Sequence, residues 1–304
     1  MKKVLIIGAS GFLGSELYKI FSSDNSYKTY GTYSKNKKLN LLHLDVTGIE
    51  NIKEVFENTV PDIVIIAAAL TNVEYCEKDR KMSYEINVDG IKNISRTVKD
   101  YNCKVVYVST EYVFDGQDGP YSEEDEVNPI NYYGKTKLFG EKIVQDYIDN
   151  YIIIRTTVVY GWDLKSKNFI MQLINNLNSG NQMKIPVDQI SSPTYCPNLA
   201  FMIKESCDND ITGIFNMVGK DIMGRYDFAV KAAEILNLKK SLLVPIETKN
   251  LGQVAKRPLN AGLKVDKVLG KLRCKPIGVV EGLIEVKKLY DEYSFRNCED
   301  NSYE

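Results

Sequence analysis

Short apolar runs alternate with stretches of helical periodicity through the first half of the chain. The apolar runs predict strands over residues 4–7, 28–33, 42–46, 62–69, 104–109 and 151–156. Between them, periodic apolar positions predict helices over 13–21, 49–58, 82–99 and 132–148. The runs are rich in β-branched residues, as are strands buried on both faces of a parallel sheet. This alternation predicts an α/β fold with a Rossmann-type doubly wound parallel sheet.

Three glycines join the first predicted strand to the first predicted helix. Gly8, Gly11 and Gly14 have the spacing G-x-x-G-x-x-G. A strand that runs through glycines into a helix N-terminus offers free amides and a positive dipole end to an anion, and the missing side chains admit a pyrophosphate. We therefore expect dinucleotide binding by the residues of this turn: Gly8, Ser10, Gly11, Phe12, Leu13 and Gly14.

The ends of the next strands supply the rest of the expected cofactor site. No acidic residue stands about twenty residues past the glycines, where one would hold the ribose of NAD. Ser34 and Lys35 are there instead and suit a 2′-phosphate, which favours NADPH and leaves NADH as the alternative. Asp45 is placed to reach the adenine amino group, next to Val46. Small side chains at 67–69 leave room for a flat ligand, and the expected contacts there are Ala67, Ala68, Ala69 and Thr71.

The alternation loosens after residue 160. Helices are predicted over 169–177, 226–236 and 278–290, a short strand over 214–218 and a loop over 188–194. We interpret this part as a smaller C-terminal α/β substrate-binding cap. Residues 1–160 are then the NAD(P)-binding domain, and 161–304 mostly the cap, with some segments returning to the first domain.

Composition excludes several classes of function. The net charge of the 304 residues is −1, so no global field favours nucleic acid or an acidic membrane, and the chain has no apolar run of membrane-spanning length. Six scattered cysteines and a single histidine, His43, count against a zinc site and against a Ser-His-Asp hydrolase. We expect no metal, cytosolic thiols and a cytoplasmic protein. In proteins of this α/β class, exposed apolar helices of two subunits often pack together, so we expect that the chain can form a homodimer.

A tyrosine and a lysine at helical spacing supply candidate chemistry. Tyr133 and Lys137 stand four residues apart at the start of a predicted helix, so their side chains share one face. A free phenol has a pKa of about 10, and a neighbouring ammonium lowers it toward neutrality. Tyr33 and Lys37 match the same spacing in a place without such meaning. Tyr133 and Lys137 differ from that pair in their position. They begin the predicted helix that follows, after one loop, the strand whose carboxyl end carries Thr110.

These motifs resemble those of the extended short-chain dehydrogenase/reductases. More narrowly, residues 109–116 (S-T-E-Y-V-F-D-G) resemble a block of the dTDP-4-dehydrorhamnose reductase family, as do 133–137 with 140–141, 188–189 with 192–194, and 256–258. The resemblance implies NAD(P)H-dependent reduction of the 4-keto group of a nucleotide-linked 6-deoxyhexose, in dTDP-rhamnose and polysaccharide biosynthesis. It makes Tyr133 the proton donor, Thr110 the residue that orients the carbonyl, and Lys137 the residue that tunes Tyr133 and binds ribose.

The same resemblance identifies a substrate side that departs from the family pattern. Its expected residues are Glu111, Tyr112, Val158 and Arg257, with Arg257 a candidate for the phosphates. Glu111 replaces an aspartate, and Val158 stands where bacterial members usually have tryptophan. The methionine adenosyltransferase regulatory subunit has a similar Tyr-Val-Phe-Asp-Gly block and a similar segment at 257–261. A non-catalytic nucleotide-binding subunit is therefore the alternative, as is a reductase of another nucleotide sugar.

Overall fold

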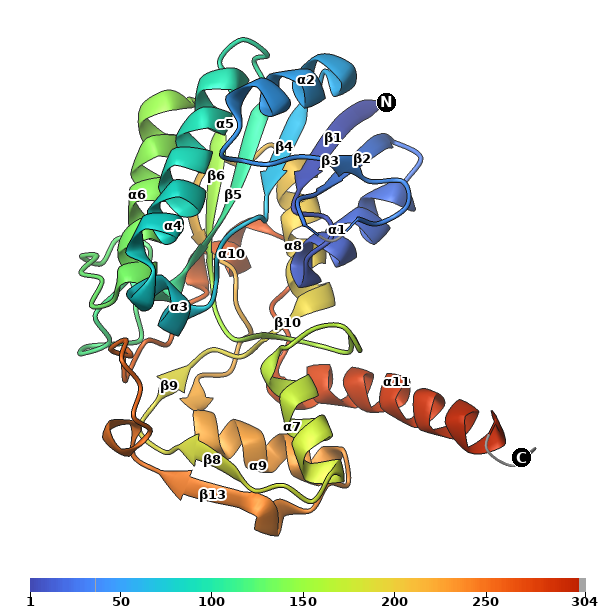
Figure 1. Ribbon diagram of the computed structural model, residues 1–304, viewed down its shortest axis with the longest axis vertical. Helices are drawn as coiled ribbons and strands as arrows, with labels where there is room; N and C mark the ends of the chain where they lie inside the picture. The colour runs from blue at the N-terminus through green and yellow to red at the C-terminus, as the bar shows by residue number, and fades with distance from the viewer. Residues whose placement is uncertain (36, 301–304) are drawn as a thin grey trace.

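A single parallel sheet forms the centre of the molecule (Figure 1). The structure is a computed structural model that describes residues 1–35 and 37–300. The strands of the sheet are β1 (Lys2–Ile7), β2 (Tyr27–Tyr33), β3 (Leu42–His43), β4 (Ile63–Ile66), β5 (Lys104–Thr110), β6 (Tyr151–Thr156) and β11 (Gly213–Asn216). Their spatial order is β11-β6-β5-β4-β1-β2-β3, and every neighbouring pair is parallel. The chain adds β2 and β3 on one side of β1 and β4, β5 and β6 on the other, so a topological switch point lies between β1 and β4, where such sheets bind ligands.

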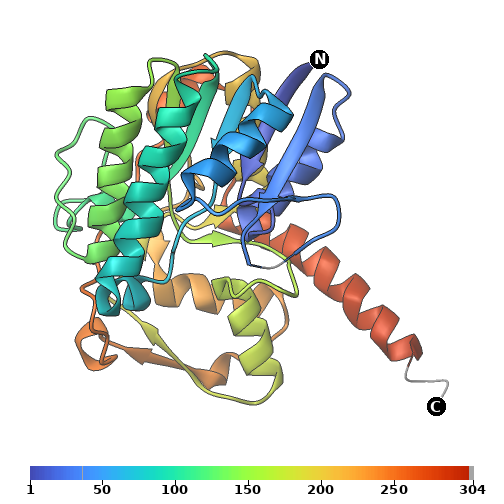
Figure 2. The same cartoon turned by 45° about the horizontal axis from the view of Figure 1, so that its top comes forward.

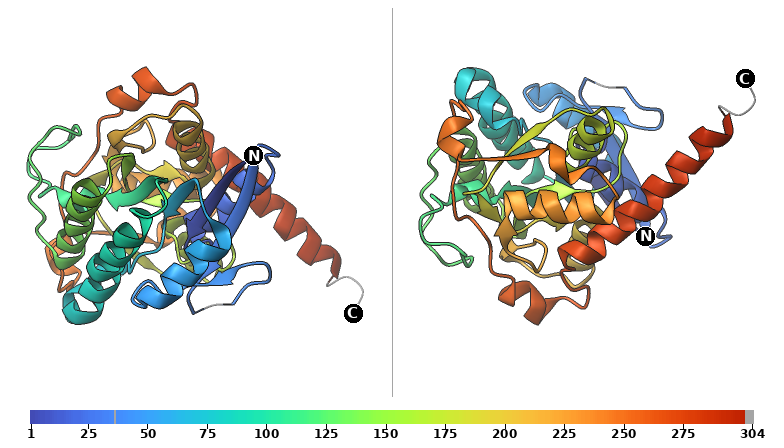
Figure 3. Two further views of the ribbon diagram at one scale, coloured as in Figure 1. Left: turned by 90° about the horizontal axis from the view of Figure 1, so that it is seen from above. Right: turned by 90° about the horizontal axis from the view of Figure 1, so that it is seen from below.

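Helices cover both faces of this sheet, because alternate residues of each strand point to opposite sides. Val4 and Ile6 pack on one side, against helices α1 (Phe12–Ser22), α8 (Cys196–Asp208) and α10 (Asp266–Lys271). Leu5 and Ile7 pack on the other, against α2 (Ile49–Thr59), α5 (Gly90–Val98) and α6 (Tyr132–Tyr147). The view from above shows these two helical layers (Figure 3). The predicted doubly wound α/β fold is confirmed.

A second apolar core lies beyond the carboxyl ends of the strands (Figure 1). It joins helices α7 (Phe169–Asn178), α9 (Arg225–Ile235) and α11 (Val279–Asp300) to the parallel strands β8 (Met183–Pro186) and β13 (Leu243–Ile246). Two further short pairs are β7 (Val159–Tyr160) with β10 (Thr194–Tyr195), and β9 (Ile190–Ser191) with β12 (Met223–Gly224). Helix α11 starts in this core and its far end projects away from the body (Figure 2). None of the described helices is long and apolar enough to cross a bilayer.

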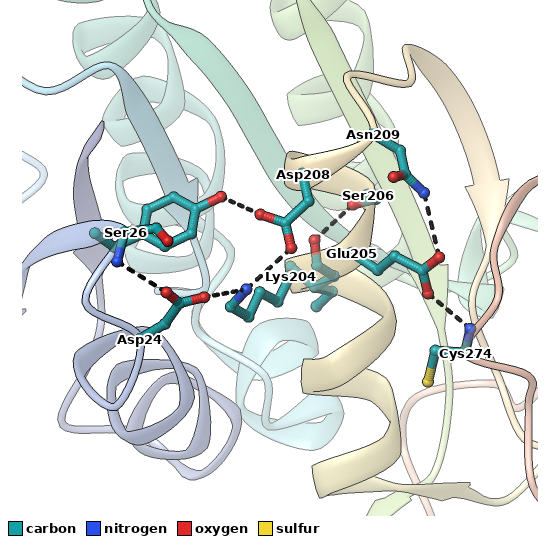
Figure 4. A network of polar contacts seen from close by, with 10 residues as sticks. Asp24, Ser26, Lys204, Glu205, Ser206, Asp208, Asn209 and Cys274 are labelled. Atoms are coloured by element: carbon teal, nitrogen blue, oxygen red, sulfur yellow. Dashed lines mark hydrogen bonds and ion pairs between the residues drawn. The ribbon is translucent and has the colours of Figure 1, made fainter. Parts of the chain in front are cut away.

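A polar network fastens α8 to the β1–β2 side of the molecule (Figure 4). Lys204 pairs with Asp24 at 2.7 Å and with Asp208 at 2.9 Å. The Tyr27 hydroxyl donates to Asp208 as well. Glu205, the next residue of α8, accepts from the backbone amide of Cys274 at 2.7 Å. The contacts of Lys204 and Asp208 hold α8 against the loop before β2 and the first residue of β2, and the Glu205 contact holds it against the segment after α10.

The structure contains helices that the hydrophobic pattern did not predict. These are α3 (Val73–Lys78), α8 and α10, whereas α4 (Arg80–Tyr84) contains the start of the helix predicted over 82–99. The helix predicted over 82–99 is interrupted by a π-helical turn, η1 (Glu85–Asp89), which leads into α5. The strand predicted over 62–69 ends at Ile66, so the three alanines form the loop that follows β4. The strand predicted over 42–46 is reduced to Leu42–His43, and part of the loop predicted over 188–194 pairs as β9 and β10.

A buried ion pair ties α6 to the sheet. Arg155, on β6, contacts both carboxylate oxygens of Glu141, at 3.1 and 2.8 Å, and the two side chains are 4% and 1% exposed. The Ser109 hydroxyl donates to the same carboxylate. The Arg155 guanidinium also donates to the carbonyl of Glu123 at 3.2 Å. This pair satisfies two charges that water cannot reach.

Removing one partner of this pair leaves the other charge buried and unpaired. We expect Glu141→Gln to lower the free energy of unfolding by about 3–5 kcal/mol, measured by urea denaturation. The double variant Glu141→Gln with Arg155→Met removes both charges and is expected to recover most of that loss. Equal losses in the single and double variants would contradict this account.

Candidate active site

The turn between β1 and α1 is shaped by close backbone approaches. Gly8 has φ +91°, and a Cβ there would lie 2.7 Å from the amide nitrogen of Ala68. A Cβ on Gly14 would lie 2.1 Å from the carbonyl oxygen of Gly8. Gly14 is therefore buried in the contact between α1 and β1 and lets the helix start close to the strand. Gly11, the exposed N-cap of α1, has no side chain to cover the first amides of the helix.

A first cleft, of about 510 Å³, extends from this turn along the ends of β2 and β4, and we call it the outer cleft. The expected cofactor residues that line it are Gly8, Ser10, Gly11, Ser34, Lys35, Asp45, Val46, Ala67, Ala68 and Ala69. Ser34 and Lys35 are exposed at its rim. The Asp45 carboxylate accepts from the amide and hydroxyl of Thr47, at 3.0 and 2.8 Å, so it also closes the turn before α2.

A second cleft, of about 480 Å³, continues from the same turn toward Val158 and Arg225 of the second half of the chain, and we call it the inner cleft. The expected residues that line it are Gly11, Phe12, Leu13, Ala67, Ala69, Thr71, Thr110, Glu111, Tyr112, Tyr133, Lys137 and Val158. The two clefts share Gly11, Ala67 and Ala69. Together they form one path from Ser34 and Lys35, which are expected to bind the 2′-phosphate, to the Tyr133 phenol. Of the expected site residues, Gly14 and Arg257 line neither cleft.

Helix α6 presents Tyr133 and Lys137 from its first turns to the end of β5. Asn131 starts the helix by accepting from the amide of Gly134 at 2.8 Å. Thr110 is the last residue of β5, and its hydroxyl accepts from the amide of Tyr112 at 3.2 Å. The three expected catalytic side chains therefore meet in one cleft.

Burial controls the protonation of this group. It lowers the pKa of Lys137 to about 7, although the Glu141 carboxylate raises it. The ammonium nitrogen lies 4.1 Å from the centre of the Tyr107 ring, a cation–π contact. Burial also raises the pKa of Tyr133, and the Thr110 hydroxyl opposes that rise through a hydrogen bond. The Tyr133–Lys137 spacing led us to expect a lowered pKa for the phenol. With the side chains of the described chain alone, the pKa of Tyr133 is raised instead.

Asn87 holds the loop after β4 against α6. Its side-chain oxygen accepts from the amide of Leu70 at 2.8 Å, and its amide group donates to the Leu70 carbonyl at 3.0 Å. The same amide group donates to the Thr136 hydroxyl at 3.1 Å. Asn87 lies in the π-helical turn, which shifts the register of the helix at this point. It therefore sets the spacing between the alanine loop and the catalytic helix.

Arg257 lies beside the inner cleft rather than on its wall. Its side chain is 10% exposed and pairs with Glu74 at 2.9 Å. Glu74 also accepts from the backbone amide of Val254 at 2.9 Å, which holds the C-terminal loop against α3. The other terminal nitrogen of Arg257, Nη1, is buried without a hydrogen-bond partner among the described residues. This guanidinium retains an unused donor next to the site.

Two site residues were missed by the sequence reasoning. The Thr32 hydroxyl accepts from the amide of Gly8 at 3.1 Å, so it fixes the glycine turn and lines the outer cleft. Arg225 starts α9 and lines the inner cleft. Thr32 was within a predicted strand, where its orientation could be read from the alternation. Arg225 had no local signal, because only the fold of the cap brings it to the cleft.

The residues present fit a dinucleotide. The first amides of α1 have no side-chain cap in the described chain, and Gly11, exposed at the start of the helix, has no side chain to block an anion from them. Exposed Ser34 and Lys35 at the outer rim supply a hydroxyl and a positive charge for a phosphate. The path between the clefts passes small side chains, over which a flat ring fits.

Comparisons with known proteins agree with this arrangement. The family model described as RmlD substrate binding domain matches residues 1–288. A dTDP-4-dehydrorhamnose reductase structure from Clostridium acetobutylicum has 32% sequence identity and a TM-score of 0.86, covering 95% of this chain and 99% of that one. The enzyme of the same description from Bacillus anthracis, in complex with NADP, has 31% identity and a TM-score of 0.85, covering 94% and 98%. Methionine adenosyltransferase 2 subunit beta from Bos taurus is 29% identical over 295 residues, 93% of this chain and 87% of that protein.

The buried carboxyl of Glu111 predicts a pH-dependent stability. Burial raises its pKa to about 8, so the folded chain holds this proton more tightly than the unfolded chain does. The free energy of unfolding therefore falls as pH rises from the ordinary carboxyl pKa of about 4.3 to about 8. Glu111→Gln removes this slope, and at pH 8 we expect it to be more stable than the wild type by up to a few kcal/mol, at ~1.4 kcal/mol per pKa unit. Urea denaturation at pH 5 and pH 8 measures the difference; a wild-type advantage that grows with pH would contradict the burial argument.

Proposed function

Since the chain belongs to the RmlD substrate binding domain family, we propose that it reduces the 4-keto group of a nucleotide-linked 6-deoxyhexose with NADPH, as dTDP-4-dehydrorhamnose reductases do. The observation that carries the proposal is the continuous path from the glycine turn to Thr110, Tyr133 and Lys137. NADPH supplies the hydride when it is bound, and the residues of the chain supply position and the proton.

The proton transfer follows from the geometry of the inner cleft. The Thr110 hydroxyl donates to the carbonyl oxygen of the sugar and orients it beside the phenol. Tyr133 gives its proton to that oxygen as hydride reaches the carbon, so the product is an alcohol and the tyrosine is left as phenolate. Lys137, as ammonium, stabilises the phenolate and binds the nicotinamide ribose. Because burial lowers the pKa of Lys137 to about 7 against the opposing effect of Glu141, a negatively charged ligand in the cleft would favour its protonated form.

The remaining parts of the site divide between the two halves of the chain. We assign cofactor binding to residues 1–160 and place the substrate-binding cap mostly within 161–304. Tyr112 and Val158 line the sugar end of the cleft. We assign Arg257, whose buried Nη1 has no partner among the described residues beside the inner cleft, to the substrate phosphates. The scattered free cysteines of the described chain favour a reducing cytoplasm. There a homodimer would make activated deoxysugar for polysaccharide synthesis.

A regulatory binding subunit is the second candidate, favoured by the similarity to methionine adenosyltransferase 2 subunit beta over 93% of the chain. The fold and the cofactor path suit both functions. The two differ in turnover, because a subunit that only binds has no chemical need for Thr110, Tyr133 and Lys137 in one cleft. NADPH oxidation by the purified chain with a panel of 4-keto nucleotide sugars separates them.

Loss of the Tyr133 hydroxyl removes the proposed proton donor. We expect Tyr133→Phe to lower kcat with dTDP-4-dehydrorhamnose by about 10²–10⁴-fold, the usual contribution of a general acid. NADPH binding, followed by fluorescence titration, is expected to change little. Tyr132→Phe is the matched control, because Tyr132 is the neighbouring residue of the same helix and lines neither cleft. Unchanged turnover in Tyr133→Phe would exclude this residue as the donor.

The outer rim predicts the cofactor preference. The double variant Ser34→Ala with Lys35→Ala removes the two groups that suit the 2′-phosphate. We expect kcat/KM for NADPH to fall by about 10-fold, with that for NADH nearly unchanged, since a charged hydrogen bond is lost only with NADPH. Lys28→Ala is the control, because Lys28 lies on β2, the strand that precedes these residues, and lines neither cleft. Equal losses with both cofactors would show that the rim does not recognise the phosphate.

A further inference from the structure

The start of the catalytic helix is fixed by one side chain that makes two contacts. Asn131, the N-cap of α6, is 2% exposed. Its side-chain oxygen accepts from the amide of Gly134 at 2.8 Å, and its side-chain amide group donates to the carbonyl of Lys256 at 2.9 Å. An acceptor alone is enough to cap a helix, since aspartate and serine cap about as well as asparagine. The donor of Asn131 therefore has a separate role, which is to hold a segment 125 residues further along the chain.

The segment that Asn131 holds carries Arg257, which we assign to the substrate phosphates. Arg257 follows Lys256 directly, and its Nη1 atom is buried without a partner among the described residues. The carbonyl of Lys256 and the backbone nitrogen of Arg257 belong to the same peptide unit, which is planar and rigid. A shift of the Arg257 backbone toward a ligand therefore moves the carbonyl that Asn131 binds.

Helix α3 completes this junction with two carboxylates, and it lies beside the first turn of α6 (Figure 1). Glu74 and Glu77 are three residues apart, so they share one face of α3. Glu74 pairs with Arg257 at 2.9 Å. Glu77 accepts from the backbone amide of Tyr132 at 2.9 Å. The loop of Arg257, helix α3 and the start of α6 thus form one connected unit next to Tyr133.

We propose that Asn131 is a positioning residue that couples binding of the substrate diphosphate at Arg257 to the placement of the proton donor Tyr133. This inference rests on the proposed function, which includes the assignment of Arg257 to the phosphates. Tyr133 lies two residues after Asn131, so the bond from Asn131 to the Lys256 carbonyl sets the position of the phenol relative to the phosphate loop. Binding energy from a part of the substrate that does not react is then used to align the groups that do, which raises kcat.

Asn131→Asp separates the two contacts. Aspartate retains the cap acceptor but has no donor for the Lys256 carbonyl. We expect kcat with dTDP-4-dehydrorhamnose to fall about 3- to 10-fold, the contribution of one hydrogen bond. The KM for this substrate and the kcat with free 4-dehydrorhamnose, which has no diphosphate, are expected to stay within about 2-fold. Asn131→Ser caps the helix with a shorter, neutral side chain, and the same result there excludes the added charge as the cause.

Inorganic pyrophosphate, supplied as a separate molecule, distinguishes coupling from a general loss of structure. We expect it to raise kcat/KM of the wild type for free 4-dehydrorhamnose about 10-fold, and that of both Asn131 variants by less than about 3-fold. Asn168→Asp is the matched control and is expected to keep the wild-type activation. Asn168 caps α7, donates to the carbonyl of Gly161 at 3.1 Å and lines neither cleft. Equal losses with the nucleotide sugar and the free sugar, or a wild type that pyrophosphate does not activate, would overturn the coupling and leave the reductase function intact.

Hydrogen exchange tests the coupling without turnover. If no 4-keto sugar is reduced, the proposed function fails, and the full-length protein is then compared with and without dTDP. We expect dTDP to slow amide exchange in the first turns of α6, residues 132–136, about 3- to 10-fold in the wild type and to leave it unchanged in Asn131→Asp. Such a difference supports the coupling, whereas equal protection in both proteins, or none in the wild type, overturns it.

Discussion

The site depends on how closely α6 can approach the end of β5. A Cβ on Gly134 would lie 2.0 Å from the carbonyl oxygen of Tyr112, and one on Gly140 would lie 2.2 Å from the hydroxyl of Tyr107. Any larger residue at these positions would push the helix away from the strand. Lys137 lies between the two contacts and Tyr133 directly precedes the first, so their reach to Thr110 is set by this backbone packing. The buried pair of Glu141 and Arg155 then holds the helix there with opposite charges.

The chemistry of the cleft follows from low solvent access more than from any single pair of side chains. Burial moves the pKa of Lys137 down and that of Tyr133 up, so each neutral form is favoured in the free protein. A tyrosine that starts protonated is suited to give a proton away. The ammonium form of Lys137 gains from any negative charge that enters the cleft, whether a phosphate or the phenolate itself. The active protonation state is therefore expected to be completed by ligand binding.

Local patterns were enough to predict the sheet, the glycine turn and the Tyr133–Lys137 face, because each depends on residues close in sequence. The apolar run from Val4 to Ile7 predicts a strand buried on both faces, and its side chains do divide between the two cores. Arg225 could not be found in this way, because its place depends on how the cap folds over the sheet. The π-helical turn around Asn87 was also missed, since the apolar positions of 82–99 were fitted by one continuous helix and did not show where its register shifts. Helix α8 lacks a side-chain cap and has apolar positions on several sides, which blurs its pattern.

The central sheet is completed only when the second half of the chain has been synthesised. Strand β11 and helices α8 and α10 are made after residue 195, yet they complete one edge of the sheet and cover one of its faces. While only the first 160 residues have emerged from a ribosome, β6 is an open edge and apolar side chains such as Ile152 and Ile154 face solvent. The catalytic residues are thus all synthesised before the wall that supports them, and the nascent chain must be protected until its second half arrives.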